Sequence, residues 1–220
     1  MPKIGFIIAQ RKEIPFLFQD TAMVHQLNDN LIKLIISGIG PKKAGEAIKH
    51  LCRDPETFFP DYLINLGFCG STQDELKIGD LVIANRLSYK NREIQLENIY
   101  MDKLKDIFQG SKYHVGKIRT FDFPVLSRKN LCQDTLAVDM ESFAIGEMAM
   151  TYQIPVIIFK IVSDIVSPQI NVKNLWRQLK NRIKYRQLVK HQLDTIADQY
   201  FHDRNHSTKT EIKKSRSFSI

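Results

Sequence analysis

Short apolar runs that end in turn residues constrain the fold of this chain more than any other feature. Five such runs occur, at Lys3–Ala9, Lys33–Ser37, Tyr62–Leu66, Asp80–Ala84 and Val156–Val162. They are rich in Ile, Val and Leu and do not alternate with polar residues, so each predicts a strand covered on both faces. A chain with several buried strands must also supply the segments that cover them.

Segments with helical spacing lie between and after these runs. Pro41–Leu51 has apolar residues three and four positions apart, and its proline suits a first helical turn. Met140–Tyr152 and Val172–Phe201 are the other two predicted helices. Strands that alternate with helices indicate an α/β sheet with largely parallel strands.

Ligands of such sheets bind beyond the carboxyl ends of the strands. The expected turns at those ends are Gly38–Gly40, Gly67–Gly70 and Ser163-Asp164. Gly38–Gly40 lacks the third glycine of a dinucleotide fingerprint, and no phosphate-binding loop or serine-hydrolase elbow occurs. The sequence therefore predicts a site at these turns that needs no organic cofactor.

The 220 residues are expected to form one domain over residues 1–202, followed by a basic polar tail at 203–220 that is predicted to be disordered. The net charge of +8 comes from residues 171–220, where 12 basic residues face 4 acidic ones; residues 1–170 hold 20 of each. Leu175, Leu179 and Ile183 form an apolar stripe, which favours a terminal helix packed on the sheet with a solvated basic face. Binding of nucleic acid is disfavoured, and contact with nucleic acid or an acidic membrane stays an alternative for this segment.

Other classes of protein are disfavoured by the sequence. No apolar run is long enough to span a membrane, and no secretory signal is recognised, so a cytoplasmic location is expected. The three cysteines, Cys52, Cys69 and Cys132, include no CxxC pair, which argues against disulfides and structural zinc. His202 and His206 have metal-like spacing but no nearby third ligand, so no metal site is predicted.

Five segments together resemble the nucleoside phosphorylase and nucleosidase superfamily. They are KIGFIIAQRKEI at 3–14, SGIGPKKAGEA at 37–47, INLGFCGSTQDELKIGDLVIA at 64–84, AVDMESFAIGEMA at 137–149 and PVIIFKIVSDI at 155–165. The likeness is strongest to methylthioadenosine/S-adenosylhomocysteine nucleosidases. The short motifs SGIGP and AVDMES are also similar to those of the hopanoid-associated branch. It implies a single-domain, three-layer α/β fold whose central mixed β-sheet is flanked by helices.

The resemblance implies roles for four residues. Glu13 would deprotonate the attacking water, Glu141 would hold the ribose hydroxyls, Asp164 would protonate the leaving purine, and Phe123 would lie against the base. Breaking an N-glycosidic bond builds positive charge on the ribose and negative charge on the base, so an acid and a water-activating carboxylate are needed. Burial at a strand end would raise the pKa of Asp164. Glu141 is expected to open a helix, where its carboxylate suits the positive end of the dipole.

Five further residues are expected to contact the substrate, namely Met140, Ser163, Gly67, Phe68 and Cys69. Phe68 is bulky for a position facing the ribose, which predicts a reshaped pocket. Each candidate also has a structural alternative: Asp164 as a turn cap, Glu141 as an ordinary first-turn residue, Met140 or Phe123 as core.

The chemistry predicted for the chain is hydrolysis of adenosine-type purine nucleosides by a homodimer without cofactor. The carboxylate of Glu13 would repel phosphate, which favours water as the nucleophile. Arg11 and Lys12 keep a phosphate-dependent purine nucleoside phosphorylase open. A non-catalytic nucleoside-binding protein of the same fold is the second alternative.

Overall fold

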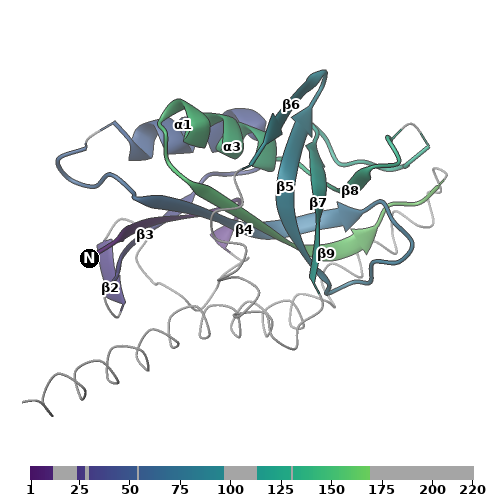
Figure 1. Ribbon diagram of the computed structural model, residues 1–220, viewed down its shortest axis with the longest axis horizontal. Helices are drawn as coiled ribbons and strands as arrows, with labels where there is room; N and C mark the ends of the chain where they lie inside the picture. Colours follow the sequence, from purple (N-terminus) through teal and green to yellow (C-terminus); the bar gives the residue numbers. More distant parts are fainter. Residues whose placement is uncertain (12–23, 28–29, 54, 97–112, 130, 169–220) are drawn as a thin grey trace, which may run out of the picture.

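A computed structural model describes residues 1–11, 24–27, 30–53, 55–96, 113–129 and 131–168 (Figure 1). Two helices are described, α1 (Pro41–Leu51) and α3 (Ser142–Thr151). The strands are β1 (Lys3–Ile8), β2 (Val24–Leu27), β3 (Asn30–Ile36), β4 (Tyr62–Ser71), β5 (Leu81–Tyr89), β6 (Arg92–Gln95), β7 (Tyr113–Thr120), β8 (Thr135–Asp139) and β9 (Val156–Ile165).

The strands form one mixed sheet in the order β2-β3-β1-β4-β8-β7-β5-β6, with β9 paired to both β4 and β5. Strand β9 is parallel to β4 and antiparallel to β5, and β4 is antiparallel to β8. These pairings close β4, β8, β7, β5 and β9 into a ring, from which β1, β3 and β2 extend as an open wing. The α/β class with a mixed sheet is confirmed. Three of the five pairings in the ring are parallel, and the pairs β4·β8 and β5·β9 are antiparallel.

Helices α1 and α3 lie side by side on one face of the sheet (Figure 1). Ala44, Ile48 and Leu51 of α1 and Ile145 and Ala149 of α3 are buried in a shared cluster with sheet residues. The observed bounds of α1 are those that the spacing predicts, since its proline starts the helix and its apolar stripe faces the sheet. A second cluster, which includes Val82, Ile118 and Ala137, fills the ring. A third cluster, which includes Phe6 and Leu34, covers the face of the open wing that lies away from the helices.

Two of the three expected turns are strand. Gly67–Gly70 lies inside β4, and Ser163-Asp164 lies inside β9, so both strands continue beyond the predicted ends. The reason is close packing: a Cβ at Gly70 would lie 3.1 Å from Asp164 Oδ2 and 3.0 Å from Val166. The glycines keep these strands close together rather than ending them. Only Gly38–Gly40 is a turn, with positive φ at both glycines.

The register between β4 and β9 contains a bulge beside the candidate site. Cys69 pairs with Val162, but the next residue, Gly70, pairs with Asp164, so Ser163 is an extra residue in β9. An extra residue changes the side of the sheet to which later side chains point. The bulge therefore decides where Asp164 directs its carboxylate.

Strands β2, β6, β7 and β8 were not predicted from the apolar pattern. Their sequences include charged or small residues such as those of YHVGKIRT in β7, so the apolar runs are broken. The predicted helix Val172–Phe201 and the tail at 203–220 lie outside the described residues, and the division of the chain at residue 202 stays a prediction. In the described part of the chain no helix is long and apolar enough to cross a membrane.

Glycine at position 146 of α3 permits close contact between the helix and the ring. An added Cβ would lie 2.5 Å from Leu87 and 3.0 Å from Ile94, whereas at Gly45 of α1 the nearest atom is 3.9 Å away. We expect Gly146→Ala to destabilise the protein by about 1–3 kcal/mol through overpacking. We expect Gly45→Ala to stabilise it by about 0.5–1 kcal/mol through helix propensity. Urea unfolding of both variants measures this, and equal effects would contradict the packing argument.

Candidate active site

A buried ion pair lies at the centre of the candidate site. Lys160 of β9 is 2% exposed, and its Nζ lies 3.0 Å from Oδ2 of Asp139, whose side chain is fully buried at the end of β8. A buried charge needs a partner of opposite sign, because desolvation of an isolated ion costs several kcal/mol. The pair thus joins the end of β8 to the middle of β9, and these two strands are not neighbours in the sheet.

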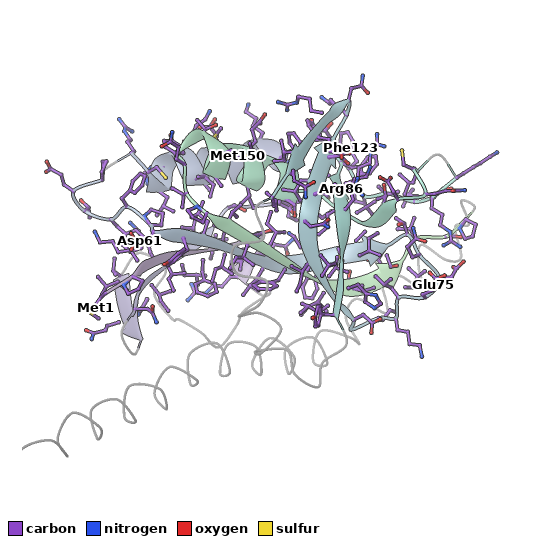
Figure 2. The ribbon with its side chains drawn as sticks, in the orientation of Figure 1. Met1, Asp61, Glu75, Arg86, Phe123 and Met150 are labelled. Atoms are coloured by element: carbon purple, nitrogen blue, oxygen red, sulfur yellow. The ribbon has the colours of Figure 1, made fainter. Side chains whose placement is uncertain are left out.

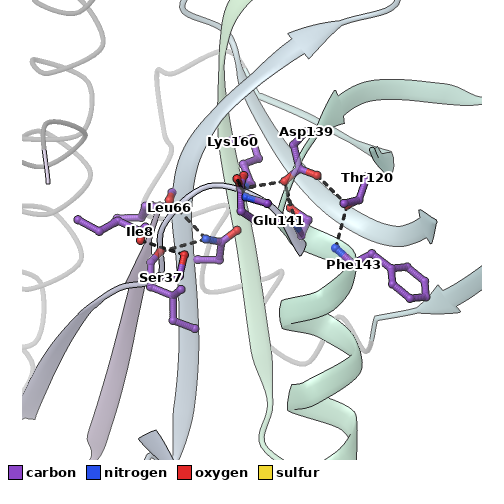
Figure 3. Close-up of polar contacts among 12 residues, drawn as sticks. Ile8, Ser37, Leu66, Thr120, Asp139, Glu141, Phe143 and Lys160 are labelled. Atoms are coloured by element: carbon purple, nitrogen blue, oxygen red, sulfur yellow. Dashed lines mark hydrogen bonds and ion pairs between the residues drawn. The ribbon is translucent and has the colours of Figure 1, made fainter. Parts of the chain in front are cut away.

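Asp139 also binds the start of α3 (Figure 3). Its Oδ2 accepts hydrogen bonds from the backbone N–H of Ser142, at 2.9 Å, and from Ser142 Oγ, at 2.5 Å. Its Oδ1 accepts from Thr120 Oγ1 of β7 at 2.7 Å, and Thr120 Oγ1 accepts from the N–H of Phe143 at 2.9 Å. The turn from strand to helix is therefore fixed at both ends by side-chain hydrogen bonds.

Glu141 lies within this turn, immediately before α3. It is 6% exposed, and its Oε1 accepts a hydrogen bond from the N–H of Gly40 at 2.9 Å. Gly40 precedes the first residue of α1, so the carboxylate lies at the N-terminus of α1 and makes no capping bond to α3. The expectation that Glu141 interacts with the dipole of its own helix is corrected in this respect: the helix it caps is α1.

Burial raises the pKa of Glu141 above its ordinary value. The neighbouring charge of Asp139 raises it further, while Lys160 and the N–H groups of Gly40 and Met140 lower it. Desolvation is the largest of these effects. The carboxylate is thus held in an environment that disfavours its charge.

Asp164 lies near the end of β9, after the bulge. It is 4% exposed, and its Oδ1 accepts a hydrogen bond from Ser163 Oγ at 2.7 Å. Ser163 Oγ also lies 3.2 Å from the carbonyl oxygen of Cys69, a second acceptor in β4. The bulge residue therefore links the Asp164 carboxyl group to the neighbouring strand.

Cys69 of β4 lies near several of these charged side chains. Burial raises the pKa of its thiol well above the ordinary value, and Lys160, Asp139 and Asp164 are all close enough to act on it electrostatically. Lys160 and Asp139 also act on Glu141. Gly70 of β4 pairs with both Val138 of β8 and Asp164 of β9, so Asp164 lies across one strand from the end of β8. We call Asp139, Glu141, Lys160 and Asp164 the charged cluster, in which Lys160 is paired with Asp139. With three carboxyl groups and one ammonium, it suits a neutral or cationic ligand better than a phosphate.

The other predicted site residues lie at different distances from this cluster. Gly67 is paired with Lys160 across β4 and β9, and Met140 is half-buried next to Glu141. Phe68 packs on the cluster that covers the open wing, and Cys69 packs inside the ring, so their side chains point to opposite faces. A ribose-facing role for Phe68 stays a prediction.

Of the two remaining predicted site residues, the structure describes Phe123 and does not describe Glu13. The ring of Phe123 is 78% exposed on the loop after β7 (Figure 2). Glu13 lies outside the described residues. Contact of Phe123 with a base, and a role for Glu13, both stay predictions.

Sequence reasoning missed Asp139, Lys160, Thr120 and Ser142, while Gly40 belongs to a turn where a site was expected. One signal was present: the lysine in VIIFKIV is a single charge within a buried apolar run, which demands a buried partner. Nothing in the sequence indicated which carboxylate that partner is. Within the described ranges, no group of three or more His, Cys, Asp or Glu side chains is placed to hold a metal ion.

Comparison with known proteins shows the family. A family model described as the phosphorylase superfamily matches residues 3–196. The chain belongs to the phosphorylase superfamily. Among curated superfamily members, a 5'-methylthioadenosine/S-adenosylhomocysteine nucleosidase from Maridesulfovibrio salexigens is 25% identical over 200 residues, covering 74% of this chain and 85% of the relative. The narrower likeness to the hopanoid-associated branch stays a prediction.

Solved structures of superfamily members share the fold. The methylthioadenosine/S-adenosylhomocysteine nucleosidase of S. pneumoniae, bound to a transition-state inhibitor, has a TM-score of 0.73 at 21% identity, covering 90% of this chain and 99% of that one. Futalosine hydrolase of Helicobacter pylori has a TM-score of 0.74 at 19% identity, covering 90% and 98%. The nucleoside phosphorylase-like fold is thereby confirmed.

The raised pKa of Glu141 gives a pH dependence of stability. The folded state holds the Glu141 proton more tightly than the unfolded state, so stability is lost as the pH rises from about 4.5 through the folded pKa. We expect Glu141→Gln to match the wild type near pH 4 and to be more stable at pH 8, by on the order of 1 kcal/mol. Urea unfolding at several pH values measures this.

A matched control for that experiment is Glu75→Gln. Glu75 is an exposed carboxylate far from the charged cluster (Figure 2). Its replacement is expected to change stability by less than about 0.5 kcal/mol at either pH. A Glu141→Gln variant that is less stable than the wild type at pH 8 would contradict the desolvation argument.

Proposed function

We propose that the protein is a purine nucleosidase that hydrolyses the N-glycosidic bond of adenosine-type nucleosides such as methylthioadenosine and S-adenosylhomocysteine. The observation that carries the proposal is the burial of two carboxyl groups near the Lys160–Asp139 pair: Glu141, bound by the N–H of Gly40, and Asp164, across Gly70 from the end of β8. The names of the curated relatives support the substrate class. The likeness of the fold alone would not distinguish these substrates.

Each carboxyl group suits one part of the reaction. Glu141, before α3, accepts hydrogen bonds and can orient two ribose hydroxyls, which fixes the sugar for attack at its anomeric carbon. Asp164, with its Oδ1 bound by Ser163 Oγ, can deliver a proton to N7 of the departing purine. The leaving base then departs neutral, and Glu13 is proposed to activate the water. Met140, Gly67, Cys69 and Phe68 are proposed to line the sugar side, and Phe123 the base.

Water is the proposed nucleophile because of charge. The charged cluster holds three carboxyl groups and one ammonium, that of Lys160, which is paired with Asp139; this excess of carboxyl groups repels a phosphate dianion. A phosphorylase needs an excess of positive donors at this place. Phosphorolysis by way of Arg11 or Lys12, and binding without turnover, are the alternatives that the experiment separates.

We propose that the enzyme is a cytoplasmic homodimer. The resemblance to the nucleosidases implies the homodimer, and the sequence favours the cytoplasm and disfavours nucleic acid as a partner. Sedimentation of the purified chain tests the dimer.

Release of free base from methylthioadenosine, S-adenosylhomocysteine, adenosine and inosine, with and without phosphate, tests the function. We expect release of adenine without phosphate. Asp164→Asn should lower the rate by at least about 100-fold, because the leaving base loses its proton donor. Chromatography of the released base is the measurement.

Asp74→Asn is the matched control for that variant. Asp74 is exposed and binds Arg128 at 2.7 Å, away from the charged cluster, so its removal should leave the rate unchanged. Strict dependence on phosphate would replace the hydrolase by a phosphorylase. Binding of nucleosides without release from any of them would favour the binding protein.

A further inference from the structure

Asp139 is a buried carboxylate to which the proposed reaction gives no role. Its side chain is fully buried, and its oxygens already accept from Thr120 Oγ1, Ser142 N–H, Ser142 Oγ and Lys160 Nζ. A carboxylate offers about four acceptor sites, so none is left for a ligand. Asp139 therefore cannot act by touching a substrate.

The hydrogen-bond partners of Asp139, in contrast, hold the backbone next to Glu141. Ser142 follows Glu141 directly, and Thr120 holds the next N–H, that of Phe143. Together with the bond from Phe121 N–H to the carbonyl oxygen of Asp139, these bonds fix the backbone on both sides of Glu141. The direction of the Glu141 side chain is thus set by the hydrogen bonds of Asp139.

Lys160 gives Asp139 a second effect on Glu141. The ammonium lies 3.0 Å from Asp139 and is close enough to Glu141 to act on its charge (Figure 3). A buried cation deprived of one carboxylate moves toward another, since an unpaired buried charge is strongly unfavourable. Without the charge of Asp139, Lys160 would pair with Glu141 and occupy the oxygens that a ligand needs.

We propose that Asp139 is a positioning residue for nucleoside binding, which holds Lys160 and the first turn of α3 so that the Glu141 carboxylate stays free for the sugar hydroxyls. The inference rests on the role proposed for Glu141 above. Asp139 acts only through Glu141, so its contribution disappears when Glu141 is changed.

The test compares Asp139→Asn with Asp134→Asn. Asp134 lies just before the same strand, and it also pairs with a buried lysine, Lys117, at 2.8 Å. Both variants remove a carboxylate that pairs with a buried lysine, but Asp134 is half-exposed and leaves Lys117 paired with Glu93, and only Asp139 lies beside Glu141. Circular dichroism and thermal unfolding show that each variant is folded.

The measurements are the Kd for 5′-methylthiotubercidin, by titration calorimetry, and the KM for methylthioadenosine. The probe carries carbon at the position of N7, so it binds without being cleaved by proton transfer there. We expect Asp139→Asn to raise both the Kd and the KM by at least about tenfold, because binding is weakened. Asp134→Asn should change either constant by less than about twofold. Equal values for Asp139→Asn and the wild type would overturn the inference.

A double variant separates positioning from a general loss of structure. If Asp139 acts through Glu141, Asp139→Asn should change the Kd of Glu141→Gln by less than about twofold. Independent, additive losses would overturn the inference. If Asp139→Asn does not fold, Ser142→Ala replaces it, because this change removes only the hydroxyl bond; a weakening of about threefold is expected, and none would overturn it.

These outcomes are distinct from those that test the function. A wild-type protein that binds the probe but releases no base refutes the nucleosidase, while the Kd values still decide the role of Asp139. If the wild type releases base and its Kd equals that of Asp139→Asn, the proposed function is supported and the positioning role of Asp139 is refuted. A wild type that neither binds nor cleaves refutes both.

Discussion

The ion pair between Lys160 and Asp139 is the contact on which the arrangement of the site depends. Through it, β9 is joined to β8, and through the other hydrogen bonds of Asp139, β8 is joined to β7 and to the first turn of α3. Removing one partner of such a pair costs about 3–5 kcal/mol, because the other remains buried and charged. Two apolar residues would stabilise the fold as well, so stability alone does not explain the pair.

The closed ring of strands explains why these groups meet. Strand β9 runs parallel to β4 and β8 runs antiparallel to it, and both pair with β4 at Gly70 and Ser71, so the pairing within the ring brings them together rather than a shared strand direction. The bulge at Ser163 then turns Asp164 relative to the residues before it. An uninterrupted register would send the Asp164 side chain to the other face of the sheet. Closure of the ring and one extra residue thus place acids from distant parts of the sequence together.

Much of this fold could be predicted from the sequence, and the reasons for the exceptions are physical. The spacing in Pro41–Leu51 gave the bounds of α1, and the apolar run at Lys3–Ala9 gave β1 to within one residue, since both patterns report burial directly. Strand β7 was missed because Lys117 and Arg119 break its apolar pattern. The partners that let Lys117 be buried come from other segments: Glu93 from β6, and Asp134 from the position before β8.

The site was predictable to a different degree. Glu141 and Asp164 were identified from the family resemblance, and the structure places both in the charged cluster. The bond from Gly40 to Glu141 joins residues 101 positions apart, and no local pattern shows such a contact. The same holds for Asp139: its motif was visible, but its partners depend on how three strands are paired.

The environment of Glu141 disfavours its charged form and so lowers the stability of the folded protein at neutral pH. Desolvation raises its pKa, and the adjacent charge of Asp139 adds to the effect, whereas Lys160 and two backbone N–H groups oppose it. Within the described part of the chain, such a carboxylate has lost its hydration and accepts hydrogen bonds from the N–H groups of Gly40 and Met140. Two further donors, such as the hydroxyls of a sugar, would complete its bonding. The unfavourable desolvation of Glu141 in the free protein therefore favours binding of a ligand that brings those donors. By pairing with Lys160, Asp139 prevents the ammonium from donating to Glu141 in place of the ligand.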